Sequence, residues 1–181
     1  MSLNSELGDL KVVFTAEQIA ARVRELAHRI SDDYRGRTVY AVCVLDNGFV
    51  FMADLVRALD VPVVCQFVKP QTQKVEHGSE IFYGPELNIQ GKHVLLVEGI
   101  VQSGITQEFL MRNLMAQGAL SVKLATFLDK QVKRRVALQA DYSGFAIEDS
   151  YVLGYGLGSH LLGRNLPYVA SAAKTPAVSA R

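Results

Sequence analysis

The stretch from Val94 to Thr106, VLLVEGIVQSGIT, restricts the possible folds more than any other part of the sequence. Its continuous Val/Leu run is typical of a strand buried on both faces of a parallel sheet. We expect the strand at His93 to Val97, the run to end at Glu98, and a turn of small residues to lead through Gly104 into a helix from Thr106 to Ala116. Such a turn can present backbone N–H groups and a helix N-terminus to an anion. The stretch therefore predicts a phosphate-binding loop, with a plain strand-to-helix turn as the alternative.

Strand and helix patterns alternate along the rest of the chain. Thr15 and Gln18 have the spacing of a capping box, which predicts a helix from Ala16 to Asp33. A second helix is expected at Phe49–Leu59, and further strands at Thr38–Leu45, Val61–Val68, Ser121–Leu128 and Tyr151–Tyr155. This order predicts an α/β fold: one domain with a mostly parallel, twisted sheet and helices on both of its faces. Ligands of such folds bind outside the carboxyl ends of the strands.

Two segments depart from this alternation. Residues 69–85 are polar with scattered charges, which predicts a mobile flap over the carboxyl edge of the sheet. Residues 170–181 contain mostly Ala, Ser, Pro and Lys without periodicity, and we expect a disordered tail there. The expected domain spans residues 1–181, with its core at about residues 12–169.

The composition excludes several classes of partner. A net charge of +1 and no basic run longer than Lys133-Arg134-Arg135 give no electrostatic case for nucleic acid, but a small anionic substrate fits. No segment approaches the about 18 apolar residues of a membrane span, and the N-terminus has no leader pattern. Cys43 and Cys65 both lie in apolar runs and are expected to be core thiols of a reducing compartment, which predicts a cytoplasmic protein.

Several blocks, in order, resemble type I phosphoribosyltransferases, and most closely their hypoxanthine-guanine branch. Beside the phosphate loop, they are FMADLVRAL, GKHVLLVE, LDK, DYSGFAI, and YVLGYGL followed by RNLPYV, within about Val12 to Val169. The resemblance implies the type I fold and a role in purine salvage. It implies transfer of ribose 5-phosphate from 5-phosphoribosyl-1-pyrophosphate (PRPP) to hypoxanthine or guanine, with Mg²⁺ and loss of pyrophosphate. A homo-oligomer is also implied, since the family commonly forms one.

The resemblance also assigns expected roles to residues. The 5-phosphate would be held by Gln102, Ser103, Gly104, Ile105 and Thr106. Glu98 would accept hydrogen bonds from the ribose hydroxyls and is the candidate metal ligand; a solvated or salt-bridged carboxylate is the alternative.

Three further residues would meet the purine base. Lys130 would donate to the 6-oxo group, Tyr151 would stack on the ring and Val152 would add backbone contacts. Without the surrounding blocks, a surface lysine and a core tyrosine would be the ordinary interpretations. Arg164 would meet pyrophosphate, and an ordinary surface arginine is its alternative.

The chain departs from the family pattern at positions that carry charge. Gln102 stands at the position of the catalytic Asp, Gly99 at that of the second acid, and Gly158 at that of a late metal-binding Asp. The pyrophosphate loop is Asp46, Asn47 and Gly48, with a carboxylate where the family has a lysine. These changes predict impaired or altered transfer, because stabilising developing charge is usually the largest catalytic contribution. A rearranged site in which Asp46 and Glu98 jointly hold Mg²⁺ is an alternative.

Three functional hypotheses follow. The first is a purine phosphoribosyltransferase with an altered active site. The second is a non-catalytic regulatory protein that binds a nucleotide monophosphate or PRPP, since the phosphate loop is intact while the acids beside it are missing. The third is transfer to a different base or from a different ribosyl phosphate.

Overall fold

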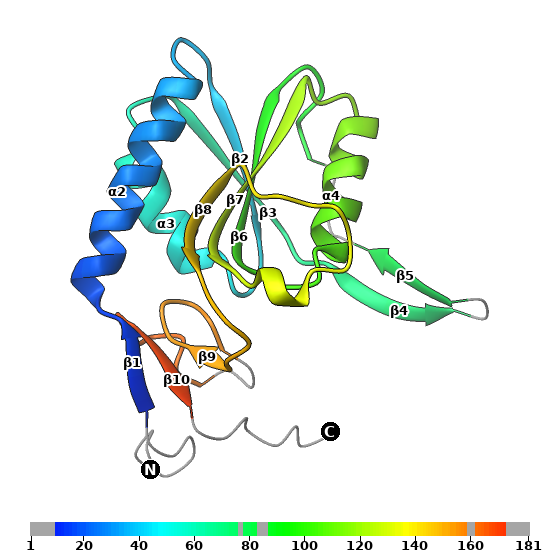
Figure 1. Cartoon of the computed structure of the whole chain (residues 1–181). Helices are drawn as coiled ribbons and strands as arrows, with labels where there is room; N and C mark the ends of the chain where they lie inside the picture. The colour runs from blue at the N-terminus through cyan, green and yellow to red at the C-terminus, as the bar shows by residue number, and fades with distance from the viewer. Residues whose placement is uncertain (1–9, 76–77, 83–86, 159–161, 173–181) are drawn as a thin grey trace.

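A parallel sheet of five strands forms the centre of the computed structural model, which describes residues 10–75, 78–82, 87–158 and 162–172 (Figure 1). The strand order is β3-β2-β6-β7-β8, and every neighbouring pair is parallel. The strands are β2 (Val39–Val44), β3 (Val63–Val68), β6 (His93–Val101), β7 (Ser121–Asp129) and β8 (Tyr142–Ala146). The central strands are almost entirely buried, as their continuous apolar runs predict.

Helices cover both faces of this sheet. In Figure 1, α2 (Ala16–Asp33) and α3 (Phe49–Ala58) lie on one side and α4 (Ile105–Ala116) on the other. The buried side chains accordingly form two clusters, one with α2 and α3 and one with α4. The predicted capping box begins α2: the Thr15 backbone N–H donates to Gln18 Oε1 at 2.9 Å, and the Gln18 N–H donates to Thr15 Oγ1 at 3.4 Å. The α/β expectation is confirmed.

The sheet differs from the predicted one in two places. Strand β6 does not end at Val97 but continues through Glu98 to Val101, because residues 98–101 keep pairing with β7 as far as Asp129. The turn before α4 is correspondingly shorter. Strand β8 was not expected, since its five residues, YSGFA, carry only a brief alternation of buried and exposed positions.

A second, antiparallel sheet joins the two ends of the described chain in the order β1-β10-β9. It consists of β1 (Leu10–Phe14), β10 (Val169–Ala172) and β9 (Val152–Leu153). The strand predicted at Tyr151–Tyr155 is therefore shorter and lies outside the large sheet. The expectation of a disordered tail is wrong for residues 170–172, which pair with β1. Because the paired residues are more than 150 positions apart, no local sequence pattern predicts this strand. Residues 173–181 lie outside the described part of the chain.

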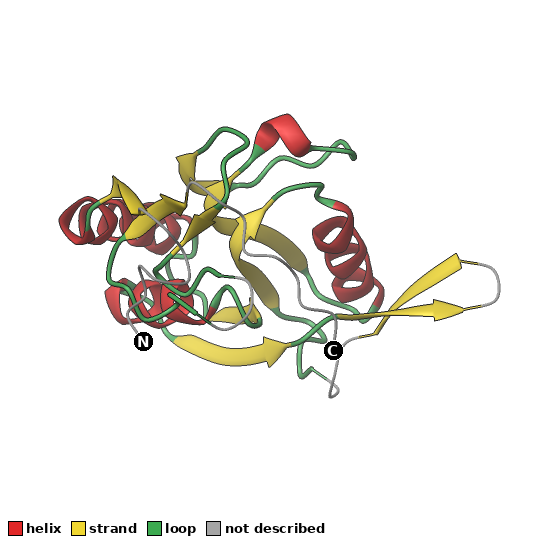
Figure 2. Ribbon diagram, turned by 90° about the horizontal axis from the view of Figure 1, so that it is seen from below, coloured by secondary structure: helices red, strands yellow, loops and turns green. Residues whose placement is uncertain are grey.

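The segment expected as a flap contains an antiparallel hairpin of β4 (Gln71–Val75) and β5 (Gly78–Phe82). The hairpin extends away from the large sheet in both views (Figures 1 and 2). Residues 76–77 and 83–85 of that segment lie outside the described residues, and its mobility stays a prediction. In the part of the chain that is described, no helix is long and apolar enough to cross a membrane.

The two cysteines differ in environment. Cys43 on the inner strand β2 is buried, and burial raises the pKa of its thiol to about 12. Cys65 is exposed, so the expectation that both are core residues is wrong for it. The reason is the strand order, which places β3 at the edge of the sheet.

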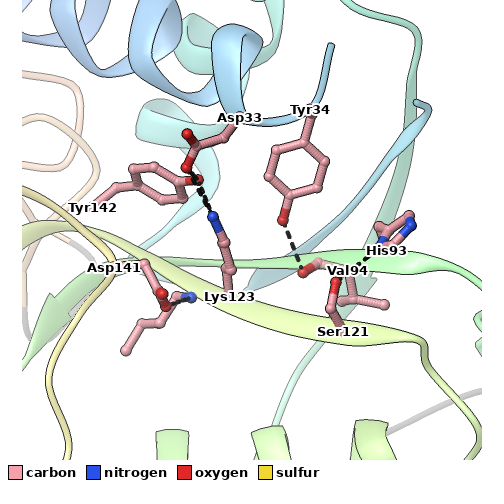
Figure 3. A network of polar contacts seen from close by, with 9 residues as sticks. Asp33, Tyr34, His93, Val94, Ser121, Lys123, Asp141 and Tyr142 are labelled. Atoms are coloured by element: carbon pink, nitrogen blue, oxygen red, sulfur yellow. Dashed lines mark hydrogen bonds and ion pairs between the residues drawn. The ribbon is translucent and has the colours of Figure 1, made fainter. Parts of the chain in front are cut away.

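A polar network closes the amino edge of the sheet (Figure 3). The Lys123 ammonium donates to Asp33 at 2.8 Å and to the Tyr142 hydroxyl at 3.0 Å, and that hydroxyl donates to Asp33 at 2.6 Å. The hydrogen bond from Lys123 lowers the pKa of Asp33. Nearby, the Tyr34 hydroxyl donates to the Val94 carbonyl at 3.4 Å. These contacts tie the end of α2 to β6, β7 and β8, on the edge opposite the loops that follow the strands.

Candidate active site

A cavity of about 510 Å³ lies where β2 and β6 end and α4 begins. Three of the predicted phosphate-binding residues, Gln102, Ser103 and Thr106, line it, as does Glu98. Its other lining residues are Val44, Leu45, Asn47, Pro70, Ile100, Gln107, Lys133 and Arg135. The structure thus brings the predicted loop and the predicted ribose-binding carboxylate to one wall.

The phosphate loop has the expected form of a tight turn into a helix. Gly104 is the N-cap of α4, and its backbone carbonyl accepts the Glu108 N–H at 2.9 Å. The first N–H groups of a helix have no partner within the helix and carry its positive dipole end, which favours an anion. Gly104 and Ile105 do not line the cavity, and the Ile105 side chain is exposed. Only the backbone groups of these two residues can therefore contribute to anion binding.

Glu98 is buried, with 4% of its surface exposed, so the solvated alternative does not hold. Gln107 of α4 donates its Nε2 to Glu98 Oε2 at 2.8 Å. Burial raises the pKa of the Glu98 carboxyl to about 8, and the hydrogen bonds from Gln107 and the Gly99 backbone partly oppose this. Sequence reasoning missed Gln107; the available signal was a polar residue on the helix side that packs against the sheet.

Two cations on the cavity wall were also missed as site residues. Lys133 and Arg135 follow β7, and the Arg135 backbone N–H donates to the Ser103 carbonyl at 2.9 Å. The Lys133 ammonium pairs with Asp149. The basic run was visible in the sequence, but only the fold shows that it faces the phosphate loop.

A second cavity of about 390 Å³ adjoins the first and shares Asn47, Ile100 and Gln102 with it. All three residues expected at the base line it: Lys130, Tyr151 and Val152. Asp149, Ser150, Leu157 and Gly158 complete the lining. Lys130 is buried rather than a solvated surface charge. Its Nζ donates to the Ser150 carbonyl at 2.8 Å and lies 3.6 Å from Asp149 Oδ1.

The expected pyrophosphate loop lies at the junction of the two cavities, but its carboxylate does not. Both oxygens of Asp46 accept from Lys69 Nζ at 3.0 Å, and Asp46 lines neither cavity. A free carboxylate at this position would repel a bound anion, and the Lys69 cation offsets that repulsion. Gly48 is the N-cap of α3 and is buried.

Arg164, which is expected to contact pyrophosphate, does not line either cavity. Its Nη1 donates to Asn47 Oδ1 at 2.7 Å and to the Gly156 carbonyl at 2.6 Å, and its Nη2 donates to the Gly158 carbonyl at 2.8 Å. The guanidinium therefore lies behind Asn47, because the backbone turn at residues 154–158 supplies its acceptors.

The donor set does not fit a magnesium ion held by the protein. Among the residues that the structure describes, Glu98 is the only acid lining the first cavity, and it is buried with Gln107 bonded to it. Asp46 faces Lys69, so the two carboxylates of the rearranged-site alternative are engaged separately. Across residues 10–75, 78–82, 87–158 and 162–172, no group of three or more His, Cys, Asp or Glu could hold a metal ion. Mg²⁺ prefers several oxygen ligands in octahedral geometry, which these residues do not offer.

Comparisons with known proteins agree with this arrangement. The phosphoribosyl transferase domain family matches residues 11–160. The hypoxanthine-guanine phosphoribosyltransferase of Aquifex aeolicus is 36% identical over 165 residues, covering 88% of this chain and 93% of that protein. The bifunctional protein TilS/HprT of Listeria innocua is 35% identical over 163 residues; the match covers 88% of this chain but only 25% of that protein.

A solved structure is similar as well. The crystal structure of a hypoxanthine-guanine phosphoribosyltransferase from Bacillus anthracis superposes with a TM-score of 0.83 at 35% identity, covering 90% of this chain and 98% of that one. These similarities show that the chain belongs to the phosphoribosyltransferase family, in its hypoxanthine-guanine branch.

Proposed function

We propose that this protein is a purine phosphoribosyltransferase that transfers ribose 5-phosphate from PRPP to a 6-oxopurine, hypoxanthine or guanine, in purine salvage. The observation that carries the proposal is the meeting of two cavities at Asn47 and Gln102. One has the phosphate loop on its wall, and the other has a buried lysine beside an aromatic side chain. A nucleotide spans such a pair of cavities with its ribose at their junction.

The roles divide between the two cavities. The α4 N-terminus with Ser103 and Thr106 holds the 5-phosphate, and Arg135 adds positive charge there. Lys133 lies on the same wall, but its charge is paired with Asp149. Glu98 accepts from the ribose hydroxyls when its carboxyl faces the cavity. In the second cavity, Lys130 donates to the 6-oxo group and Tyr151 stacks on the base.

We expect transfer to be slow. The Gln102 amide reaches both cavities and can donate and accept hydrogen bonds, but it cannot take a proton from the purine ring. A positioned general base contributes about 10²- to 10⁴-fold, so its loss slows the reaction without abolishing it. The same observation supports the second candidate, a protein that binds a nucleotide monophosphate or PRPP without turning it over.

Calorimetry followed by a turnover assay separates these candidates. PRPP, inosine monophosphate and guanosine monophosphate are titrated into the protein with and without Mg²⁺, and nucleotide formation from hypoxanthine, guanine and adenine is then followed by chromatography. Binding with slow formation of the 6-oxopurine nucleotide is expected. Monophosphate binding without any turnover would favour the regulatory candidate, turnover of adenine alone would favour a different base, and no binding would exclude all of them.

Three accompanying features are proposed on narrower grounds. Mg²⁺ is expected to enter with the PRPP oxygens, because the cavity offers no pair of free carboxylates. A homo-oligomer is supported by exposed Val64 and Phe67 on the edge strand β3. A cytoplasmic location is supported by the two free cysteines.

A further inference from the structure

Lys130 carries a charge that is almost completely buried. Its side chain is 7% exposed, and the residue lines the second cavity. A buried charge is unfavourable unless protein groups compensate it. Lys130 Nζ donates to the Ser150 carbonyl at 2.8 Å, and Asp149 Oδ1, 3.6 Å away, supplies the opposite charge. At that distance, which exceeds an ordinary hydrogen bond, Asp149 attracts the ammonium without occupying one of its donors, so N–H groups remain for a ligand.

Asp149 lies between two lysines. Its Oδ2 is paired with the Lys133 ammonium, while its Oδ1 is the atom near Lys130. The hydrogen bond from Lys133 lowers the pKa of Asp149, so this carboxyl is charged at neutral pH. Both lysines belong to one turn, in which the Lys133 backbone N–H donates to the Lys130 carbonyl at 3.1 Å. From the loop before β9, the Asp149 carboxylate therefore bridges the two side chains of that turn.

The backbone around these side chains is held independently of the ion pairs. The Lys130 N–H donates to the Val101 carbonyl at 2.9 Å, and the Ile147 N–H donates to the Asp129 carbonyl at 3.0 Å. The lysine side chain, in contrast, is long and flexible, and an ammonium without a counter-charge is more stable when it turns toward water. A neutral carbonyl alone does not balance a buried charge. The Asp149 carboxylate is therefore the group that keeps the Lys130 ammonium in the cavity.

We infer that Asp149 is a positioning residue of the second cavity: it holds Lys130 at the 6-position of the purine and so sets the preference for a 6-oxo over a 6-amino group, while Lys133 holds Asp149 from the other side. The inference rests on the proposed function. An ammonium can only donate hydrogen bonds; a 6-oxo group accepts one, whereas a 6-amino group presents donors that a buried cation opposes. Removing the charge of Asp149 should therefore reduce selectivity at the 6-position and leave the rest of the nucleotide site unchanged.

The variant Asp149→Asn tests this directly, because it keeps the size of the side chain and removes its charge. Calorimetry compares inosine 5′-monophosphate, which has the 6-oxo group, with purine riboside 5′-monophosphate, which has only hydrogen there. We expect the Kd of inosine monophosphate to rise about tenfold and that of purine riboside monophosphate to change by less than about twofold, because only the former accepts from Lys130. An equal rise for both nucleotides would show a merely structural role and overturn the inference, as would two unchanged Kd values.

Two further variants serve as controls. Glu148→Gln makes the same charge change at the neighbouring exposed position, which lines neither cavity, and should alter neither Kd. Asp149→Glu keeps the counter-charge and should retain part of the preference for the 6-oxo nucleotide. If Glu148→Gln lowered that preference as much as Asp149→Asn, the effect would not belong to Asp149 and the inference would be wrong.

The role of Lys133 is tested by a double-mutant cycle on the ratio of the two Kd values. The ratio cancels any effect of Lys133 on the phosphate group, which both nucleotides share. Lys133→Gln should lower the preference in the wild-type chain, because the Asp149 carboxylate loses the partner that holds it. It should change the preference little when it is added to Asp149→Asn. An equal change in both backgrounds would overturn this role of Lys133.

The outcomes keep this inference separate from the proposed function. A wild type that binds inosine monophosphate no more tightly than purine riboside monophosphate overturns the inference, while nucleotide formation from hypoxanthine still supports the transferase. A wild type that binds neither nucleotide also overturns the inference. If that protein forms no nucleotide either, the proposed function is overturned as well.

Discussion

At the scale of single residues, the buried pair of Glu98 and Gln107 couples the stability of the protein to pH. Because the pKa of Glu98 is raised to about 8 in the folded protein, the folded state holds a proton that the unfolded state releases near its ordinary value of 4.5. The contribution of this carboxyl to the free energy of unfolding is therefore fully present below about pH 4.5. It is lost as the pH rises towards 8, by up to about 1.4 kcal/mol per pH unit. The variant Glu98→Gln has no titrating carboxyl group at this position and therefore lacks this pH dependence. Urea unfolding at pH 6 and pH 8 should show the wild type losing stability relative to this variant, and parallel pH profiles would contradict the assignment.

Gln102 gives a second prediction at this scale. Gln102→Asp places a carboxylate where both cavities meet, and a base there should raise the rate of nucleotide formation from hypoxanthine by about 10²-fold or more. The control is Gln102→Asn, which shortens the side chain without adding a base and should give no gain. Steady-state kinetics on the two variants measure the difference. If Gln102→Asp is no faster than the wild type, some step other than proton transfer limits the reaction.

At the scale of elements, the contact between β6 and the loop after β2 explains why Gly99 replaces an acid. A Cβ at this position would lie 2.2 Å from the Asn47 carbonyl oxygen. Overpacking of this kind costs about 1 to 3 kcal/mol, so Gly99→Ala should lower the thermal midpoint and weaken pyrophosphate binding through the displaced loop. Gly99→Asp should do the same rather than restore a metal ligand. A stable Gly99→Asp variant with Mg²⁺-dependent pyrophosphate binding would contradict this prediction, because it would show that the loop after β2 can shift to make room for the side chain.

The elements themselves were largely predictable. The α2 helix matches its expected bounds because its cap and apolar stripe are local signals. The extension of β6, the short strand β8 and the pairing of β10 with β1 were not predictable, since each depends on a partner strand far along the chain. The exposure of Cys65 follows from strand order, which a local pattern does not reveal.

At the scale of the whole molecule, the network of Asp33, Lys123 and Tyr142 joins α2 to the sheet at the edge opposite the candidate active site (Figure 3). Tyr142→Phe removes the hydroxyl that donates to Asp33 and accepts from Lys123. It should lower the free energy of unfolding by about 1 to 2 kcal/mol, measured by urea denaturation, and leave ligand affinity unchanged. Tyr40→Phe is the matched control, since no hydrogen bond of its hydroxyl is found in the described structure. Altered pyrophosphate affinity in Tyr142→Phe would mean that the two edges are coupled.

The sequence by itself determined the fold class, and it predicted the strand-to-helix loop before α4 and the residues that line the two cavities, because a buried strand, a helix cap and short motifs are local patterns. Only the tertiary structure decided how the charges at the site are arranged. Asp46 is paired with Lys69, Arg164 lies behind Asn47, and Glu98 is buried against Gln107. Each of these pairs joins residues on different segments of the chain. A charged side chain is available to a ligand only if no neighbouring protein group already pairs with it. These pairings are set by the packing of loops and helices on the sheet, so no local sequence pattern predicts them.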